Sequence, residues 1–248
     1  IKKKISFGSY VLGAKANESI YENNTVYPQE YVTYHTAGGL SNGFHKTFLV
    51  IKVNPIGYIP DENQLQFFHH FTIDIKYKEP TKNILENTSV YKLLIIAPSS
   101  FTRLLQPLVK HKNSIGMKTV LVNLDEVYKK GWKGRDQPEK IKYFIKKAIE
   151  DWGIKYVILV GGMKGLSTKW YLPIRYSHVI IPKGTQELIE PEFISDLYYA
   201  DIYDSEGNFS SWDPNNDGIF AAWGKPGVKN DTGIDMQPDV CLGRLACT

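Results

Sequence analysis

The sequence has 248 residues, of which 42% are hydrophobic and 13% aromatic, with 30 basic and 26 acidic side chains. This length allows one large domain or two small ones, and the apolar content excludes a disordered chain. No apolar run approaches the roughly 18 residues of a membrane span, and a formal net charge of +4 is too small for a nucleic-acid-binding surface.

Residues 1–80 are predicted to form an all-β domain. Three segments rich in Tyr, Val, Phe, Ile and Thr are expected to be strands: residues 30–36, 46–54 and 64–77. In the last segment, apolar residues alternate with polar ones, as in a half-buried antiparallel strand: Phe71, Ile73, Ile75 and Tyr77. Turns rich in Gly, Pro and Asn separate the segments, so we expect an antiparallel, β-sandwich-like module.

Residues 81–90 are predicted to be a linker, and residues 91–248 an α/β domain. Three apolar runs are expected to be parallel strands: residues 91–97, 117–122 and 155–160. A helix is expected in each connection, which gives the order βαβαβ with right-handed crossovers. The sequence therefore predicts a parallel sheet after the all-β domain.

The first of these helices has ambiguous end signals. Ser99 or Ser100 is expected to cap it, and Gly116 is expected to end it in the left-handed conformation. Pro107 is expected to kink its first turns, unless the helix proper begins there.

The second helix has clearer signals. Asp136 stands in the cap position, Pro138 in the first turn and Glu139 at the spacing of a capping box. Apolar residues then follow with a helical period as far as residue 152, and Gly153 ends the helix.

The regular pattern weakens beyond residue 162. Strands are expected at residues 176–181 and 239–243, with an irregular insertion of about residues 185–238 between them. A loop of this length in a compact domain is usually functional or stabilised by a ligand.

The insertion contains a candidate calcium site. Oxygen donors fall at alternate positions of a loop of the EF-hand type, the last being a main-chain carbonyl: Asp213, Asn215, Asp217 and Ile219. Gly218 permits the sharp turn, but Gly224 stands where the usual glutamate would be, so a more distant carboxylate must complete the site. The nearby acids are Asp196, Asp201, Asp204, Asp231 and Asp235. The alternative is a turn without metal, because Asp, Asn and Gly favour turns in any case.

Other motifs have plainer interpretations. Residues 161–165 are glycine-rich but lack the spacing of a phosphate-binding loop, so we interpret them as a turn at the carboxyl edge of the sheet. Cys241 is expected to be a small apolar residue in a buried strand. Cys247 has no histidine placed by a local motif, and neither cysteine is interpreted as a nucleophile.

Histidines and glycosylation triplets give weak signals. The histidines form no ligand pair on a helix and are interpreted as surface or edge-strand residues: His35, His45, His69, His70, His111 and His178. The Asn-x-Ser/Thr triplets matter only if the protein is exported, and they begin at Asn17, Asn23, Asn87, Asn208 and Asn230.

The order of several segments resembles one family. Five segments of the second half carry this resemblance: residues 92–98, 108–120, 156–162, 195–201 and 239–245. The last two are Ser-Asp-Leu-Tyr-Tyr-Ala-Asp and Asp-Val-Cys-Leu-Gly-Arg-Leu. Together the five segments resemble the amino-terminal part of the catalytic region of gingipain-type cysteine peptidases, the C25 family. Segments of the first half resemble the end of that family's propeptide: residues 27–30, 53–60 and 75–77.

This resemblance implies a caspase-like fold and a secreted or cell-surface endopeptidase, with a β-rich propeptide before the catalytic unit. In the family, a histidine–cysteine dyad hydrolyses a protein or peptide substrate. Both residues follow the Gly-Arg strand, and no residue up to Thr248 matches them. The resemblance therefore implies that this chain carries no catalytic residue, is inactive by itself, and works with a downstream catalytic subdomain. It also implies that the propeptide dissociates or is cleaved near residues 78–90.

Two other classes of function stay open. The same fold can serve as a non-catalytic surface or adhesion module, because a fold does not fix a function. A nucleotide-binding, flavodoxin-like domain would need phosphate-loop glycines that the sequence lacks.

Overall fold

The computed structural model describes residues 4–7, 10–13, 25–41, 44–77, 90–129, 133–183, 186–224 and 227–248. The chain divides into two compact units. The first comprises residues 1–35 and 49–79, and the second comprises residues 36–48 and 80–248. The second unit is therefore built from two separate stretches of chain. Residues 81–89 of the expected linker lie outside the described residues.

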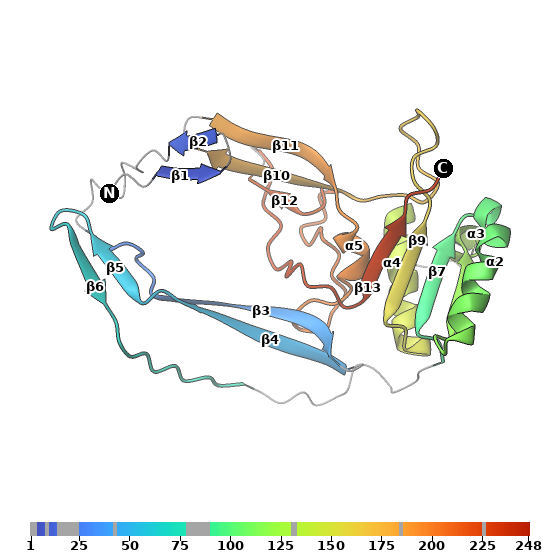
Figure 1. Ribbon diagram of the computed structural model, residues 1–248, viewed down its shortest axis with the longest axis horizontal. Helices are drawn as coiled ribbons and strands as arrows, with labels where there is room; N and C mark the ends of the chain where they lie inside the picture. Colours follow the sequence, from blue (N-terminus) through green and yellow to red (C-terminus); the bar gives the residue numbers. More distant parts are fainter. Residues whose placement is uncertain are drawn as a thin grey trace. The chain divides into compact units, whose positions relative to one another are not determined.

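Antiparallel strands characterise the amino-terminal part, as predicted (Figure 1). β1 (Lys4–Phe7) pairs with β2 (Tyr10–Gly13), and β5 (Ile56–Ile59) pairs with β6 (Gln64–Phe67). The two longest strands described, β3 (Val32–Ser41) and β4 (Phe44–Val53), pair in a ladder of their own. One end of this ladder, residues 36–41 and 44–48, belongs to the second unit and is called the ladder end below.

The predicted strand at residues 64–77 is wrong in its second half. β6 ends at Phe67, and residues 68–77 belong to no strand. Ile75 and Tyr77 are 55% and 80% exposed. Alternation of apolar residues does not make a strand here, because no described strand pairs with this segment.

A parallel sheet of four strands forms the centre of the second unit, and this confirms the predicted α/β class. Its strand order is β13–β9–β7–β8. The bounds are Leu93–Ala97 for β7, Thr119–Asn123 for β8, Tyr156–Val160 for β9 and Cys241–Leu245 for β13. Every residue of β7 is buried, as expected of a central strand covered on both faces.

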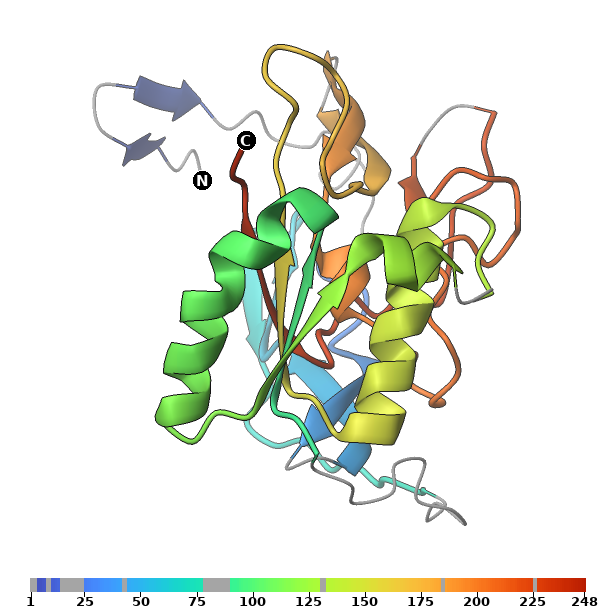
Figure 2. The same cartoon turned by 90° about the vertical axis from the view of Figure 1, so that its right-hand side faces the viewer.

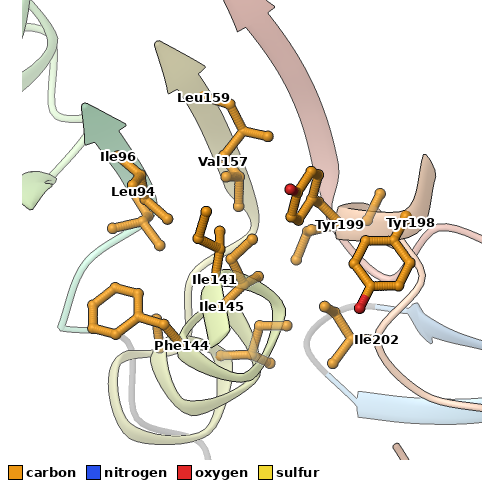
Figure 3. Close-up of a cluster of buried hydrophobic side chains, with 14 of the residues drawn as sticks. Leu94, Ile96, Ile141, Phe144, Ile145, Val157, Leu159, Tyr198, Tyr199 and Ile202 are labelled. Atoms are coloured by element: carbon orange, nitrogen blue, oxygen red, sulfur yellow. The ribbon is translucent and has the colours of Figure 1, made fainter. Parts of the chain in front are cut away.

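Helices cover both faces of this sheet (Figure 2). On one face, α2 (Ser99–Ser114) packs through Phe101, Leu105 and Leu108 against Leu93 and Ile95. On the other face, α4 (Gln137–Trp152) and the short, unpredicted α3 (Leu124–Lys129) contribute to a larger core. Figure 3 shows side chains from β7, β9, α4 and the segment of residues 198–202 meeting there: Leu94, Ile96, Val157, Leu159, Ile141, Phe144, Ile145, Tyr198, Tyr199 and Ile202. Among the described residues, no helix is long and apolar enough to cross a membrane.

The ends of α4 confirm the sequence signals with one change. The Asp136 side chain accepts a hydrogen bond from the Glu139 main-chain N–H, and Gly153 adopts the left-handed conformation with φ 69°. The Glu139 carboxylate does not close a capping box on Asp136. It accepts instead from the main-chain N–H of Arg135 and pairs with the Arg135 guanidinium.

The start of α2 differs from the prediction. Pro98 is the cap residue, Ser99 is the first helical residue, and no side-chain hydrogen bond caps the helix. The helix runs through Pro107 without interruption, and Gly116 follows its end with φ 78°. None of its residues is fully buried, so only one side of α2 meets the sheet.

The insertion is more regular than predicted at its beginning. β10 (Tyr176–Lys183) pairs antiparallel with β11 (Gln186–Ile194), which the sequence placed in an irregular loop. β12 (Ala222–Trp223) pairs parallel with β10. The remainder, apart from the short α5 (Leu197–Ala200), consists of turns held by side-chain hydrogen bonds.

Candidate functional site

The predicted calcium loop is a succession of turns closed by its own acidic and amide side chains. The Asp213 carboxylate accepts hydrogen bonds from the main-chain N–H groups of Asp217 and Gly218, each at 3.0 Å. Asn215 Oδ1 accepts from Asp217 N at 3.0 Å, and Asp217 Oδ1 accepts from Ile219 N at 2.8 Å. Gly218 has φ 83°, which confirms the need for glycine at this turn.

A basic side chain from outside the loop neutralises its first acid. Arg135, just before α4, donates from Nη1 to Asp213 Oδ2 at 2.5 Å and to Asn216 Oδ1 at 2.8 Å. Its Nη2 donates to Glu139 Oε1 at 2.7 Å, and its guanidinium lies 4.9 Å from the centre of the Phe220 ring. The Asp213 side chain is completely buried, so this ion pair supplies a charge that burial requires.

Asp231 is the distant acid that lies beside the loop. It is 2% exposed, and its Oδ2 accepts from Ala222 N at 2.8 Å. Its Oδ1 is buried and has no hydrogen-bond partner among the described residues. Burial raises the pKa of Asp231, and the charges of Asp213 and Asp217 raise it further. Asn215 also donates to the main-chain oxygen of Lys229 at 3.2 Å.

The other acids near in sequence have different partners. Asp196 pairs with Arg244, and Asp201 accepts from the Trp212 indole N–H at 2.7 Å. Asp204 closes a turn by accepting from Glu206 N and Asn208 N. Asp235 accepts from the main-chain N–H of Gly38. Asp231, by contrast, is bonded to the main chain of Ala222, shortly after the loop.

The donors around the loop fit a hard cation. They are carboxylate, amide and main-chain carbonyl oxygens, the set that calcium prefers. Within the described residues, no three His, Cys, Asp or Glu side chains gather closely enough to hold a metal ion. The loop carboxylates would thus have to draw together around a bound cation.

A second polar cluster, which the sequence analysis did not single out, lies in the core. Lys142 on α4 is fully buried, its Nζ donates to the Ser210 carbonyl, and it lies 4.3 Å from the centre of the Tyr198 ring. Burial lowers the pKa of Lys142, while the charges of Asp201 and Asp239 oppose that change. The burial of Lys142 could have been inferred only from the helical period of α4, because Lys142 lies next to the apolar face of that helix.

Asp239 is the second acid of this core cluster. It accepts from Ile202 N at 2.6 Å and Tyr203 N at 2.8 Å, and so ties residues 202–203 of the insertion to the segment before β13. Burial raises the pKa of Asp239 to about 7, although these two hydrogen bonds oppose the change. Asp201 is also buried, and burial raises its pKa.

Arg244 locks the carboxyl edge of the sheet. From β13 it donates to both oxygens of Asp196 at 2.7 and 2.8 Å, to Gly161 O and Leu172 O at 3.0 Å, and to Pro173 O at 3.2 Å. The residues 161–165 follow β9 at this edge, as predicted, and Gly161 has φ 127°. A side chain at Gly162 would come within 2.8 Å of the Ala246 carbonyl oxygen. At the carboxyl edge of the sheet, main-chain carbonyl groups therefore pack closely around the Arg244 guanidinium.

The prediction that Cys241 is buried is wrong. Cys241 and Cys247 are free and exposed. Cys241 lies at the amino end of the edge strand β13, where it lines an open cavity of about 280 Å³ with Leu93, Met117 and Tyr156. Ligands of open parallel sheets bind at the opposite, carboxyl end, so Cys241 stands at the wrong end for that chemistry.

The histidines mostly lie at the surface, as interpreted from the sequence. The exposed ones are His35, His69, His70 and His111. His178 is an exception, since it is 9% exposed on β10, and His45 Nε2 lies 3.3 Å from the Asp204 carbonyl oxygen. Asn17, Asn23 and Asn87 lie outside the described residues.

The parallel sheet, covered by helices on both faces, defines an α/β protein of caspase-like architecture. The sequence profile of peptidase family C25 matches residues 86–248, which is more than half of the chain. The chain therefore belongs to peptidase family C25, the gingipain-type cysteine peptidases. No curated protein and no solved structure matches it.

Proposed function

We propose that residues 91–248 are the first α/β subdomain of a secreted or cell-surface cysteine endopeptidase. The family match across this sheet is the observation that carries the proposal. In such chemistry, a thiolate attacks the peptide carbonyl after a histidine takes its proton. A histidine–cysteine dyad outside these residues performs that step, and the chain described here supplies the scaffold beside it.

The partner surface of this scaffold is the β13 side of the sheet. β13 is an edge strand of the described sheet, Leu245 is 46% exposed, and the cavity beside Cys241 is open. An exposed parallel edge beside an apolar cavity suits a further strand and a covering helix. A downstream catalytic subdomain of the same polypeptide would provide both.

A peptidase assay tests this proposal. The chain alone is expected to show no peptide hydrolysis, and a longer polypeptide that includes the following region is expected to be active and sensitive to thiol alkylation. Hydrolysis by the chain alone, lost on Cys247→Ala, would place the nucleophile inside it and contradict the proposal. A longer polypeptide without thiol-dependent hydrolysis would favour the adhesion module instead.

The amino-terminal region supports a propeptide role in folding and latency. The ladder end belongs to the same compact unit as the sheet. Thr47 Oγ1 donates to the Ser205 carbonyl at 2.7 Å, and Gly38 N donates to Asp235. Through these contacts, the ladder end would stabilise the insertion until the propeptide is removed on activation.

Calcium at Asp213, Asn215, Asp217 and the Ile219 carbonyl would stabilise the insertion. Metal binding can replace a missing core as a source of order, and this part of the chain has little regular structure. The weaker calcium sites of extracellular modules, with Kd of about 10⁻⁴–10⁻³ M, suit the proposed location. Calorimetric titration is expected to show binding that Asp217→Ala abolishes, and heat release unchanged by that substitution would remove the site.

A further inference from the structure

We propose that residues 71–77 pair with the same segment of a second copy of this chain, as antiparallel strands related by a two-fold axis at Ile75. The proposal does not depend on the peptidase function. It rests on an exposed segment with the sequence of a strand, and on an order of charges that is complementary to itself.

The segment of residues 71–77 has the alternation of a strand but lacks a partner strand. Its apolar and polar residues alternate throughout, which favours a strand with one apolar face. Figure 1 shows it as an extended trace beyond β6, and residues 69–77 make no main-chain hydrogen bond with any other described residue. Unpaired N–H and C=O groups along an extended segment form a template on which another chain can pair.

The apolar face of this segment is exposed. Ile73 is 41%, Ile75 55% and Tyr77 80% exposed. Only the beginning of the segment has an aromatic neighbour, since the ring centres of Phe68 and Phe71 lie 6.0 Å apart. Three large apolar side chains that follow one another on one face are therefore available for contact with a partner.

The charges of the segment identify a second copy as that partner. In an antiparallel pair with Ile75 opposite Ile75, Asp74 of each copy lies opposite Lys76 of the other copy, which gives two ion pairs. Ile73 then lies opposite Tyr77, so the apolar side chains of both copies share one face. Asp74 and Lys76 are both exposed and can reach these positions.

Other registers of the same pair lose this complementarity. Centring the pair on Asp74 or on Lys76 places two like charges opposite each other, and centring it on Ile73 places Asp74 opposite Thr72. Parallel strands in register would also oppose like charges, and like charges directly opposite are destabilising. The register centred on Ile75 is therefore favoured, and its two-fold symmetry uses the same surface of both copies.

Sedimentation velocity of the full chain over a range of protein concentrations tests the pairing. Two short strands form a small interface, so we expect a reversible dimer with a Kd of about 10⁻⁵–10⁻⁴ M. Asp74→Lys or Lys76→Asp turns both ion pairs into contacts between like charges, and each substitution is expected to raise the Kd at least about tenfold. The double variant with both substitutions restores opposite charges and is expected to recover the Kd of the wild type.

Matched controls make the same changes of charge elsewhere on the surface. Asp61→Lys and Lys110→Asp are at exposed positions outside the segment and should leave the Kd unchanged. Circular dichroism checks that each variant is folded.

Cross-linking locates the two-fold axis independently of charge. In a variant that carries Cys241→Ser and Cys247→Ser, the added substitution Ile75→Cys is expected to give a disulfide-linked dimer on oxidation with copper phenanthroline. Opposite residues of antiparallel strands have Cβ atoms about 4.5–5.5 Å apart, close to the separation that a disulfide needs. Ile73→Cys in the same background is expected to stay monomeric under denaturing conditions, because Tyr77 lies opposite it.

Each possible result supports or overturns the pairing. A wild type that stays monomeric up to about 10⁻³ M overturns it. A dimer that is insensitive to both charge reversals forms elsewhere on the molecule and also overturns it, as does a folded double variant that fails to recover the dimer. Cross-linking of Ile73→Cys in place of Ile75→Cys overturns the register, whereas cross-linking at residue 75 alone supports the axis.

Discussion

At the scale of single residues, Lys142 places the strongest constraint on the core of the second unit. Its ammonium group is fully buried, with Asp201 and Asp239 as the acidic groups whose charges favour its protonated form. Replacing one member of such a buried group leaves another charge uncompensated, which is usually strongly destabilising. Lys142 joins α4 to the insertion through the Ser210 carbonyl, and Asp239 joins residues 202–203 to the segment before β13.

The raised pKa of Asp239 predicts a pH dependence of stability. The carboxyl titrates near its ordinary value of about 3.9 in the unfolded chain and at about 7 in the folded one. Between these values the folded state binds the extra proton. The free energy of unfolding from this group therefore falls as pH rises, by up to about 1.4 kcal/mol per unit.

Asp239→Asn keeps an acceptor for the Ile202 and Tyr203 N–H groups and removes this titration. Chemical unfolding followed by tryptophan fluorescence, between about pH 4.5 and 7.5, is expected to show the wild type losing stability relative to the variant as pH rises. Lys142 and Asp201 remain in both proteins, so the difference between the two curves follows from the loss of the Asp239 carboxyl and its charge. Parallel curves for the two proteins would contradict the prediction.

At the scale of elements, α2 and α4 cover the same sheet unequally. Seven residues of α4 are buried and none of α2 is. The difference follows from the partners of each helix. Residues of α4 belong to a large buried cluster that also contains Tyr198 and Tyr199, whereas α2 packs partly buried residues against a smaller cluster of the sheet. The stability of the unit should therefore depend far more on α4.

Truncations on the two helices test this difference. Ile145→Ala, at a fully buried position of α4, is expected to cost about 2–5 kcal/mol of unfolding free energy. Leu104→Ala, at a position of α2 that is 73% exposed, is expected to change it by less than about 0.5 kcal/mol. Denaturant unfolding monitored by circular dichroism measures both, and equal losses would show that α2 has a partner on its outer face.

Prediction from sequence succeeded where local signals determine an element and failed where distant partners do. Asp136 caps α4 through its side chain and Gly153 ends it in the left-handed conformation, so both ends of the helix could be predicted from the residues themselves. Residues 68–77 alternate like a strand but have no described partner, and β11 became a strand through its pairing with β10. The loop at Asp213 was visible as a motif, whereas the hydrogen bond of Asp231 with Ala222 depends on the fold.

At the scale of the whole molecule, the boundary between the compact units does not follow the chain. Residues 36–48 belong with residues 80–248, and their contacts converge on the insertion. The His45 ring meets Tyr203 edge-on at 5.7 Å, and Thr47 bonds Ser205. Gly38 approaches the Asp204 carbonyl so closely that no side chain fits between them.

Gly38→Ala is expected to displace the ladder end from the insertion. A Cβ atom there would collide with the Asp204 main chain, whereas Gly243→Ala adds a Cβ that meets nothing within 4 Å. Hydrogen exchange of residues 201–224 should become about tenfold faster in Gly38→Ala and stay unchanged in Gly243→Ala. Equal exchange in both variants would show that the ladder end does not stabilise the insertion.

The ladder end also has a consequence for the proposed removal of the propeptide. A single cut near residues 78–90 severs the polypeptide without separating its halves, because residues 36–48 stay bound to the insertion by non-covalent contacts. The cut protein should migrate as one particle in native gels and as two bands after denaturation. If the propeptide is removed as proposed, its full release would require a second event, such as loss of the Gly38–Asp235 hydrogen bond. Cleavage of the chain and departure of the propeptide would then be separate steps with their own rates.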